Sequence, residues 1–269
     1  GTMSVILNTS GDIETYLFDN TWSMVRKLEG QNYTDILLCK DTTFLIAITS
    51  SKLDIFKRSS SGSVLNWKKT TSVNLSIQHI EETIIDTNSL HVMENGSITE
   101  YYRNGDFFSG PHKTISLVSG VAHTFSTHNR YLAVSNKTSP TGEIDIYFDY
   151  EKIQKIKIGA SIDKIIMKTD GFICSTNNFI HMYKKNRVWE KYATYKIPDG
   201  VTILDMYLSL HSEFIYIITS DYMAVLYPVT VNKQFVISEF RRFTHGGTTA
   251  NRSVSVSEYN QVTHLALDN

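Results

Sequence analysis

The chain has 269 residues, of which 41% are apolar and 20% charged, and this balance excludes an intrinsically disordered protein. Its formal net charge of −1 gives no electrostatic reason to expect bulk binding to nucleic acid or to an anionic membrane. The 15 tyrosines and 13 phenylalanines favour strands, and only four prolines occur, which excludes Pro-rich linkers.

The N-terminal residues and the two cysteines allow further predictions. Residues 1–2 resemble a cloning scar before a native start at Met3, so residues 3–269 are taken as the folded chain. No signal peptide follows, and no apolar run reaches transmembrane length, which predicts a soluble intracellular protein, cytoplasmic or nuclear. Cys39 and Cys174 are the only cysteines, and both are expected to be buried free thiols.

Along the chain, helical periodicity is nearly absent, and short apolar runs recur between small polar turns. The recurring unit is an apolar strand, a polar turn and an alternating second strand. Six units are visible, at 5–16, 44–56, 90–101, 131–147, 172–183 and 214–226. Their second strands start at Ile13, Leu53, Ile98, Ile144, Ile180 and Met223, which are 40, 45, 46, 36 and 43 residues apart.

Charged, alternating segments that suit an outer strand follow several of these units. They lie at 22–28, 64–69, 152–158, 188–195 and 235–240. In the third unit Asn95-Gly96 and Asn104-Gly105 are both strong hairpin turns, so the strand pairing there is left open. The best-formed stretch is 125–158, which reads as a serine-containing turn, a buried strand, the loop Ser135–Gly142 and two further strands.

Periods of about 40 to 45 residues with four strands per unit are those of a propeller blade. The sequence therefore predicts an all-β fold, a single β-propeller of four-stranded blades over residues 3–269, with six blades favoured and seven as the alternative. The tail segments 253–259 and 262–267 read as the opening of a further unit. We expect the C-terminal strand to close the ring, because closure removes free edges. The alternatives are a blade completed by a partner and a chain that is part of a longer protein.

The segment Phe125–Phe148, with its Tyr-Leu-Ala-Val strand and its Ile-Asp-Ile-Tyr strand, resembles a WD-repeat blade. No unit carries the Gly-His pair or the Trp-Asp dipeptide of that family, and Tyr147-Phe148 stands at the dipeptide's place. The chain thus resembles a degenerate WD-repeat protein. The resemblance implies a scaffold whose loops bind other proteins.

Motifs that would carry chemistry are absent from the sequence. There is no His-Glu-X-X-His or Cys-X-X-Cys spacing, no calcium loop, no phosphate-binding Gly-rich loop and no Gly-X-Ser-X-Gly elbow. We therefore expect no enzyme activity, no cofactor and no metal, with a propeller-type hydrolase as an alternative.

The predicted function is a non-catalytic protein–protein interaction scaffold, a subunit of a larger intracellular complex whose partners are one or more proteins. Aromatic and basic loop residues would anchor the partners. The candidates are Tyr33, Phe107, Phe108, Arg241, Arg242 and Phe243, joined by Asn136, Lys137 and Thr138 from the loop Ser135–Gly142, which is longer than the equivalent turns.

A membrane lipid is the alternative partner. The run Phe240-Arg241-Arg242-Phe243 is similar to the Phe-Arg-Arg-Gly signature of phosphoinositide-binding propellers, with Phe243 in place of the glycine. That resemblance implies two lipid sites, one for each arginine.

Overall fold

The structure, a computed structural model, describes most of the chain. The described residues are 2–29, 32–38, 43–61, 64–74, 80–85, 89–94, 96–105, 107–118, 121–208, 214–231, 234–244, 252–258 and 261–267. Within these ranges every regular element is a β-strand, and no helix has the length and apolarity required to cross a membrane. The chain divides into two compact units, residues 1–117 with 248–269 and residues 118–247, and each is described by itself.

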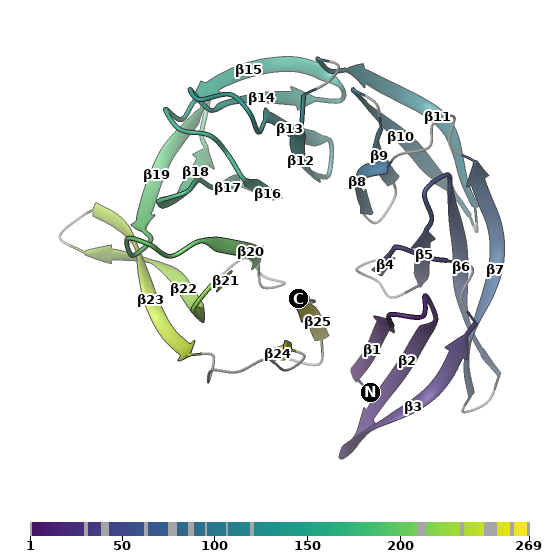
Figure 1. The fold of residues 1–269 in the computed structure, drawn as a ribbon. Helices are drawn as coiled ribbons and strands as arrows, with labels where there is room; N and C mark the ends of the chain where they lie inside the picture. The colour runs from purple at the N-terminus through teal and green to yellow at the C-terminus, as the bar shows by residue number, and fades with distance from the viewer. Residues whose placement is uncertain are drawn as a thin grey trace. The chain divides into compact units, whose positions relative to one another are not determined.

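The first unit consists of antiparallel sheets built from neighbours in sequence (Figure 1). Its three-stranded sheet has the order β1 (Thr2–Leu7), β2 (Ile13–Asp19), β3 (Thr21–Leu28). Its two four-stranded sheets are β4 (Asp35–Leu38), β5 (Phe44–Ile48), β6 (Lys52–Ser61), β7 (Val64–Asn74) and β8 (Ile80–Ile85), β9 (Ser89–Glu94), β10 (Ser97–Asn104), β11 (Phe107–Ser116). A hairpin of β24 (Arg252–Glu258) and β25 (Gln261–Leu267) forms a two-stranded sheet.

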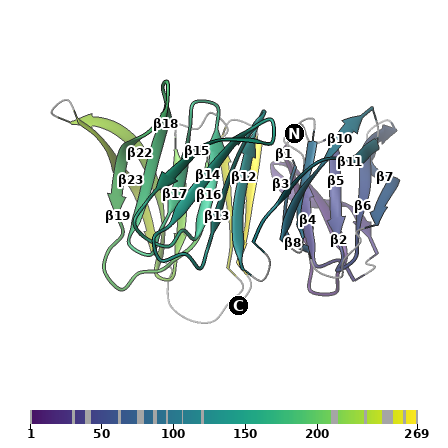
Figure 2. The same ribbon diagram turned by 90° about the horizontal axis from the view of Figure 1, so that it is seen from above.

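The second unit contains three four-stranded antiparallel sheets, whose strands run side by side in Figure 2. The first is β12 (His123–His128), β13 (Tyr131–Asn136), β14 (Glu143–Phe148), β15 (Glu151–Lys157). The second is β16 (Lys164–Lys168), β17 (Gly171–Ser175), β18 (Phe179–Lys185), β19 (Trp189–Lys196). The third is β20 (Ile203–Leu208), β21 (Ile215–Thr219), β22 (Tyr222–Val231), β23 (Gln234–Thr244).

The predicted strands are confirmed. All six second strands are present, as β2, β6, β10, β14, β18 and β22, and the five outer segments form β3, β7, β15, β19 and β23. In the sheet β8–β11, Ser97 pairs with Glu94, and Gly96 has φ +73, so Gly96 belongs to the turn before β10. The tail segments are also strands, β24 and β25.

The innermost strand of each four-stranded sheet was not located by the sequence pattern. The clearest case is β12, where a turn was expected around Phe125–Asn129. Thr124, Ser126 and Thr127 are nevertheless buried in this strand. Because buried polar side chains are tolerated when they are hydrogen-bonded, apolarity alone does not reveal such a strand.

The first unit's core lies between its sheets, and β5 shows why that strand is continuously apolar. Phe44, Ile46 and Ile48 pack against β9 and β10, whereas Leu45 and Ala47 pack on the other face with Val5 and Ile13 of the first sheet. A strand covered on both faces needs apolar residues at every position.

This core contains a buried carboxylate. The Asp54 side chain is fully buried, and its oxygens accept hydrogen bonds from the Tyr33 hydroxyl (2.8 Å) and the Ser72 hydroxyl (2.7 Å). The ammonium groups of Lys69 (2.8 Å) and Lys52 (3.3 Å) also pair with it. Four donors from the segment before β4 and from β6 and β7 therefore converge on one charge.

In the second unit, directional bonds join neighbouring sheets in addition to apolar contacts. The Met167 N–H of β16 donates to the Ser126 hydroxyl of β12 (2.8 Å). The side-chain amide of Gln154 bonds both the N–H (3.1 Å) and the carbonyl (3.4 Å) of Trp189. Cys174 is confirmed as a buried free thiol, and Cys39 lies outside the described residues.

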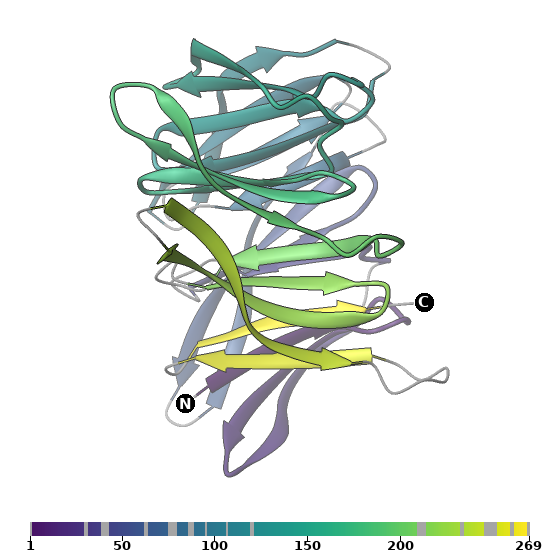
Figure 3. The same ribbon diagram turned by 90° about the vertical axis from the view of Figure 1, so that its left-hand side faces the viewer.

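Ring closure is not established by the strand ladders. Within the first unit β25 lies beside β1, as Figures 1 and 3 show, but the described ladders keep β1–β2–β3 and β24–β25 as separate sheets. The all-β class and the four-stranded antiparallel sheets are thus confirmed. Closure by the C-terminal strand and the number of blades stay predictions.

Candidate functional site

The loop between β13 and β14 is built by its own polar side chains. The Asn136 side-chain oxygen accepts from the N–H and the hydroxyl of Thr138, both at 2.8 Å, which is the hydrogen bonding of an Asx turn. The hydroxyls of Ser139 and Thr141 lie 3.1 Å apart, and the Gly142 N–H donates to the Ser139 carbonyl (3.2 Å). The loop is therefore held in one conformation by short-range bonds.

The same loop is fixed to its surroundings through its backbone. The Lys137 N–H donates to the Ala122 carbonyl (2.8 Å), and the Lys137 carbonyl accepts from the Ser161 hydroxyl. At the other end the N–H groups of residues 158 and 159 donate to the carbonyls of Gly142 (2.8 Å) and Thr141 (2.9 Å). These bonds leave the side chains, rather than the backbone, available for contacts.

The loop exposes one lysine, two threonines and one proline. Lys137, Thr138, Pro140 and Thr141 are exposed, and Asn136 is half-buried. Burial raises the pKa of the nearby Asp163, and the positive charge of Lys137 partly opposes that rise. The loop offers a rigid polar surface with one cation, suited to contacting a polar segment of a protein.

Two of the predicted aromatic anchors lie in the core instead of on a surface. Tyr33 is buried, with its hydroxyl on Asp54 and its ring edge-on to Phe56 (centroids 6.5 Å apart). Phe108 is buried and lies edge-on to Phe44 at 5.7 Å. Both follow turn residues in the sequence, which suggested loops, but tertiary packing covers their rings and leaves little for a partner to contact.

The remaining predicted residues have a described backbone only. Arg241, Arg242 and Phe243 lie in β23, opposite Val225, Ala224 and Met223 of β22, next to a β-bulge. Phe107 starts β11. The side chains of these four residues are outside the described part of the structure.

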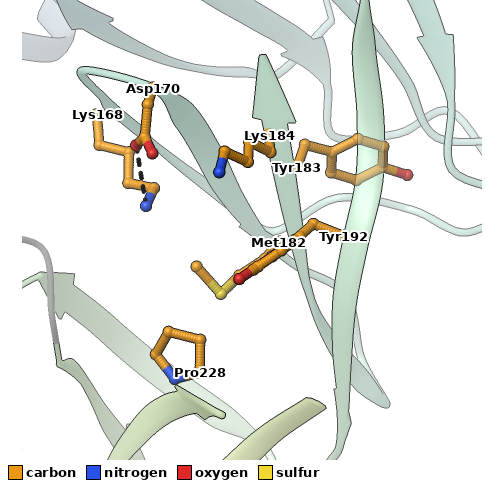
Figure 4. Close-up of a pocket in the computed structure, with 7 residues that line it drawn as sticks. All are labelled: Lys168, Asp170, Met182, Tyr183, Lys184, Tyr192 and Pro228. Atoms are coloured by element: carbon orange, nitrogen blue, oxygen red, sulfur yellow. Dashed lines mark ion pairs between the residues drawn. The ribbon is translucent and has the colours of Figure 1, made fainter. Parts of the chain in front are cut away.

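The second unit has a small depression of about 70 Å³ between its second and third sheets (Figure 4). Its lining residues are Lys168, Asp170, Met182, Tyr183, Lys184, Tyr192 and Pro228. Lys168 pairs with Asp170 at 3.1 Å, and the Lys184 ammonium lies 5.8 Å from the centre of the Tyr192 ring. Both cations thus already have an anion or an aromatic face nearby.

Strongly perturbed ionisable groups occur in the core. Burial raises the pKa of the Cys174 thiol and lowers the pKa of His181 to about 4. Burial also opposes the ionisation of Asp54, but bonds from Lys69, Ser72, Tyr33 and Lys52 outweigh it and lower the pKa to about 2. Across the described ranges, no three His, Cys, Asp or Glu side chains gather as metal ligands would.

The sequence reasoning missed an apolar row on the first sheet. Phe18, Trp22 and Met24 are exposed on β2 and β3 although all three are large and apolar. The signal in the sequence was present, since apolar residues stand on both sides of the turn Asp19-Asn20. It was attributed to an ordinary outer strand.

Comparison with known proteins shows the fold. No protein-family profile and no curated protein matches the chain in sequence. Among solved structures, KlAtg21 in complex with the coiled coil of AgAtg16 is 13% identical, with a TM-score of 0.65 over 99% of this chain and 96% of that one. Hsv2 of Kluyveromyces marxianus is 10% identical, with a TM-score of 0.63 over 90% and 95%.

One bacterial protein to which an enzyme activity is assigned has a comparable TM-score. A protein assigned as a 6-phosphogluconolactonase from Bacteroides fragilis is 10% identical, with a TM-score of 0.64 over 98% of this chain and 83% of that one. At these sequence identities, structural similarity shows only that the fold is shared. KlAtg21 and Hsv2 are β-propellers, and this chain therefore shares the β-propeller fold.

Proposed function

We propose that this chain is a non-catalytic scaffold, a subunit of an intracellular protein complex, and that one partner contacts the loop at residues 136–142. The observation that carries the proposal is the combination of a fixed loop backbone with exposed side chains at Lys137, Thr138 and Pro140. A loop that is already ordered loses little conformational entropy on binding. Loops on a rigid scaffold are where such folds carry function.

The comparison with KlAtg21 supports a protein partner. That protein was solved with a coiled coil of another chain, so a propeller of similar fold holds a protein segment. The partner of this chain would be recognised by polar groups, because the loop presents hydroxyls and one ammonium group.

The hydrolase alternative has the lactonase-like neighbour in its favour. The described nucleophile and base candidates are poorly placed for catalysis, however. Cys174 is fully buried and its pKa is raised, and His181 is buried with its pKa lowered to about 4. A scaffold therefore accounts better for the described residues.

The loop can be tested by charge reversal. We expect Lys137→Glu to weaken partner binding about tenfold, because it reverses the loop's one cation while leaving the backbone bonds in place. The free energy of unfolding should change by less than about 0.5 kcal/mol, since the side chain is exposed. The partner is first isolated by a photo-crosslinking residue at Pro140, and its affinity is then measured by biolayer interferometry.

Lys196→Glu is the matched control, because Lys196 is also an exposed lysine of the second unit. A second crosslinker at Arg187, in the turn before β19, controls for crosslinking at any exposed turn. Equal affinity of Lys137→Glu and wild type, or the same crosslinked protein from both crosslinking positions, would contradict the assignment of the loop.

A phosphoinositide membrane is the second candidate partner, and the adjacent Arg241 and Arg242 of β23 favour it. In that case we expect the double variant Arg241→Thr/Arg242→Thr to lose sedimentation with vesicles that contain phosphoinositide, because the two guanidinium groups would hold the phosphates. The double variant Lys152→Thr/Lys155→Thr removes the same charge from the exposed face of β15 and serves as control. Equal sedimentation of wild type and the arginine variant rejects the lipid function.

A further inference from the structure

The first sheet carries a row of exposed apolar side chains on one face. Phe18 is 43% exposed, Trp22 41% and Met24 54%. The register places Phe18 opposite Trp22, and Tyr16 opposite Met24, so the side chains of β2 and β3 form neighbouring cross-strand pairs. The rings of Phe18 and Trp22 are 5.3 Å apart. With Ile6, this sheet holds four of the nine large apolar side chains that the structure describes as exposed.

The opposite face of the same sheet is fully occupied. Met3, Val5 and Ile13 are buried against β5, β6 and β7. The Trp67 ring N–H donates to the Thr15 hydroxyl at 2.9 Å, which fixes this contact. A sheet with apolar side chains on both faces belongs between two neighbours, and only one neighbour covers β2 and β3 among the described residues of this unit.

The exposed row adjoins the contact between β1 and β25. The hairpin β24–β25 lies in the same unit with β25 beside β1 (Figures 1 and 3). On the face of the exposed row, Ser4 of β1 is only 3% exposed, whereas Met24, in the same cross-strand row, is 54% exposed. Within this cross-strand row burial therefore falls from β1 to β3, whereas Ile6 at the other end of β1 is 39% exposed.

The β24–β25 sheet has two strands, while each of the five sheets from β4 to β23 has four. In those five sheets the outer two strands form a hairpin, for example β6 with β7 and β22 with β23. A two-stranded sheet is marginal by itself and gains stability from further strands with an apolar face.

We propose that the row Ile6, Phe18, Trp22 and Met24 is a docking surface for a β-hairpin of a partner protein, which extends the β24–β25 sheet by two strands. The hairpin lays alternating apolar side chains on Phe18, Trp22 and Met24 and pairs its backbone with an edge of the two-stranded sheet that no described strand occupies. This is recognition by strand addition, in which backbone bonds give affinity and alternate side chains give specificity. The surface lies in the first unit and is independent of the loop at residues 136–142.

The occupant must match the surface in shape and chemistry. Two strands of about six residues each suit the length of the strands that they join. Aromatic and β-branched residues at alternate positions pair well with Phe18 and Trp22. Lys27, which lies opposite Glu14 at the end of the row, already pairs with Asp12 at 2.7 Å, so the contact rests on the apolar side chains.

Trp22 provides a direct readout of the surface. The chain has three tryptophans, and Trp67 and Trp189 are 3% and 5% exposed. Acrylamide should therefore quench one fraction of the fluorescence of the free protein, and Trp22→Phe should remove that fraction. A display library of overlapping fragments from the proteome of the source organism supplies hairpin segments, and a bound segment should protect Trp22 from acrylamide.

The binding of the selected segments to variants tests whether the residues of the row contribute to affinity. Trp22→Lys should weaken binding at least tenfold, and Ile153→Lys should leave it unchanged. Ile153 is the matched control because it is 52% exposed on β15, an outer strand of the other unit. Both variants are checked for unchanged circular dichroism before binding is measured, and Met24→Asp repeats the test with a second residue of the row.

Three results would overturn the proposal. Trp22 protected from acrylamide in the free monomer means that the chain covers the row itself. A dimer that Trp22→Lys dissociates means that the occupant is a second copy. Selected segments that bind Trp22→Lys and Met24→Asp as tightly as wild type mean that they dock elsewhere.

Discussion

Replacing Asp54 by alanine is expected to lower the free energy of unfolding by about 3 to 5 kcal/mol, the range for breaking a buried ion pair. Asp54 is fully buried and receives four donors, so the variant leaves Lys52 and Lys69 without their carboxylate and the buried Tyr33 hydroxyl without its acceptor. Urea unfolding followed by circular dichroism measures the loss. Asp199→Ala removes an exposed carboxylate and should change stability by less than about 0.5 kcal/mol.

The same carboxylate predicts a pH dependence. Its pKa is about 2 in the folded protein and about 3.9 in an unfolded chain, so its contribution to stability is complete above pH 4 and is lost as pH falls through about 2. The difference corresponds to about 2.6 kcal/mol. The gap in unfolding free energy between wild type and Asp54→Asn should therefore shrink between pH 4 and 2. A gap that stays constant over this interval would show that Asp54 has the same pKa in the folded and in the unfolded protein.

Gly142→Ala is expected to destabilise the second unit by about 3 to 5 kcal/mol. Gly142 has φ +50, and a Cβ there would lie 1.6 Å from the Ala160 carbonyl oxygen, so the backbone itself must move. The movement would also disturb the bond from the Ile158 N–H to the Gly142 carbonyl. Thermal unfolding measures the loss.

Gly159→Ala separates the two causes of that loss. Gly159 also has a positive φ, +91, but a Cβ there meets nothing within 4 Å. Only the backbone strain remains, and we expect about 1 to 2 kcal/mol. If the two variants are equally destabilised, the close approach to Ala160 has no energetic role.

Much of the fold could be predicted because apolar runs alternate with turn residues at a regular period. The second strands starting at Ile13, Leu53 and Ile180 are examples, since each follows a short polar turn and precedes a run with clear periodicity. The inner strand β12 could not be found in this way. Its Thr124 and Ser126 are buried although polar, and the Ser126 hydroxyl is bonded by the Met167 N–H, 41 residues away.

The candidate site was predictable only in part. The length of the loop after Asn136 is visible in the sequence, and the structure describes it as an exposed, hydrogen-bonded loop. The burial of Tyr33 was not visible, because its partner Asp54 is 21 residues away and reads as a solvated charge on an alternating strand. The exposed row at Trp22 and Met24 was also hidden, since periodicity identifies the two faces of a strand but not which neighbours cover them.

The bonds between sheets in the second unit have a geometric consequence. Apolar contacts are non-directional and allow one sheet to rotate on the next at little cost. The bonds from Met167 to Ser126 and from Gln154 to Trp189 join β12 to β16 and β15 to β19, that is, the inner and the outer strands of the same two sheets. Two directional anchors at opposite edges restrict the angle between these sheets, so four residues add to the packed core in setting the curvature from one sheet to the next.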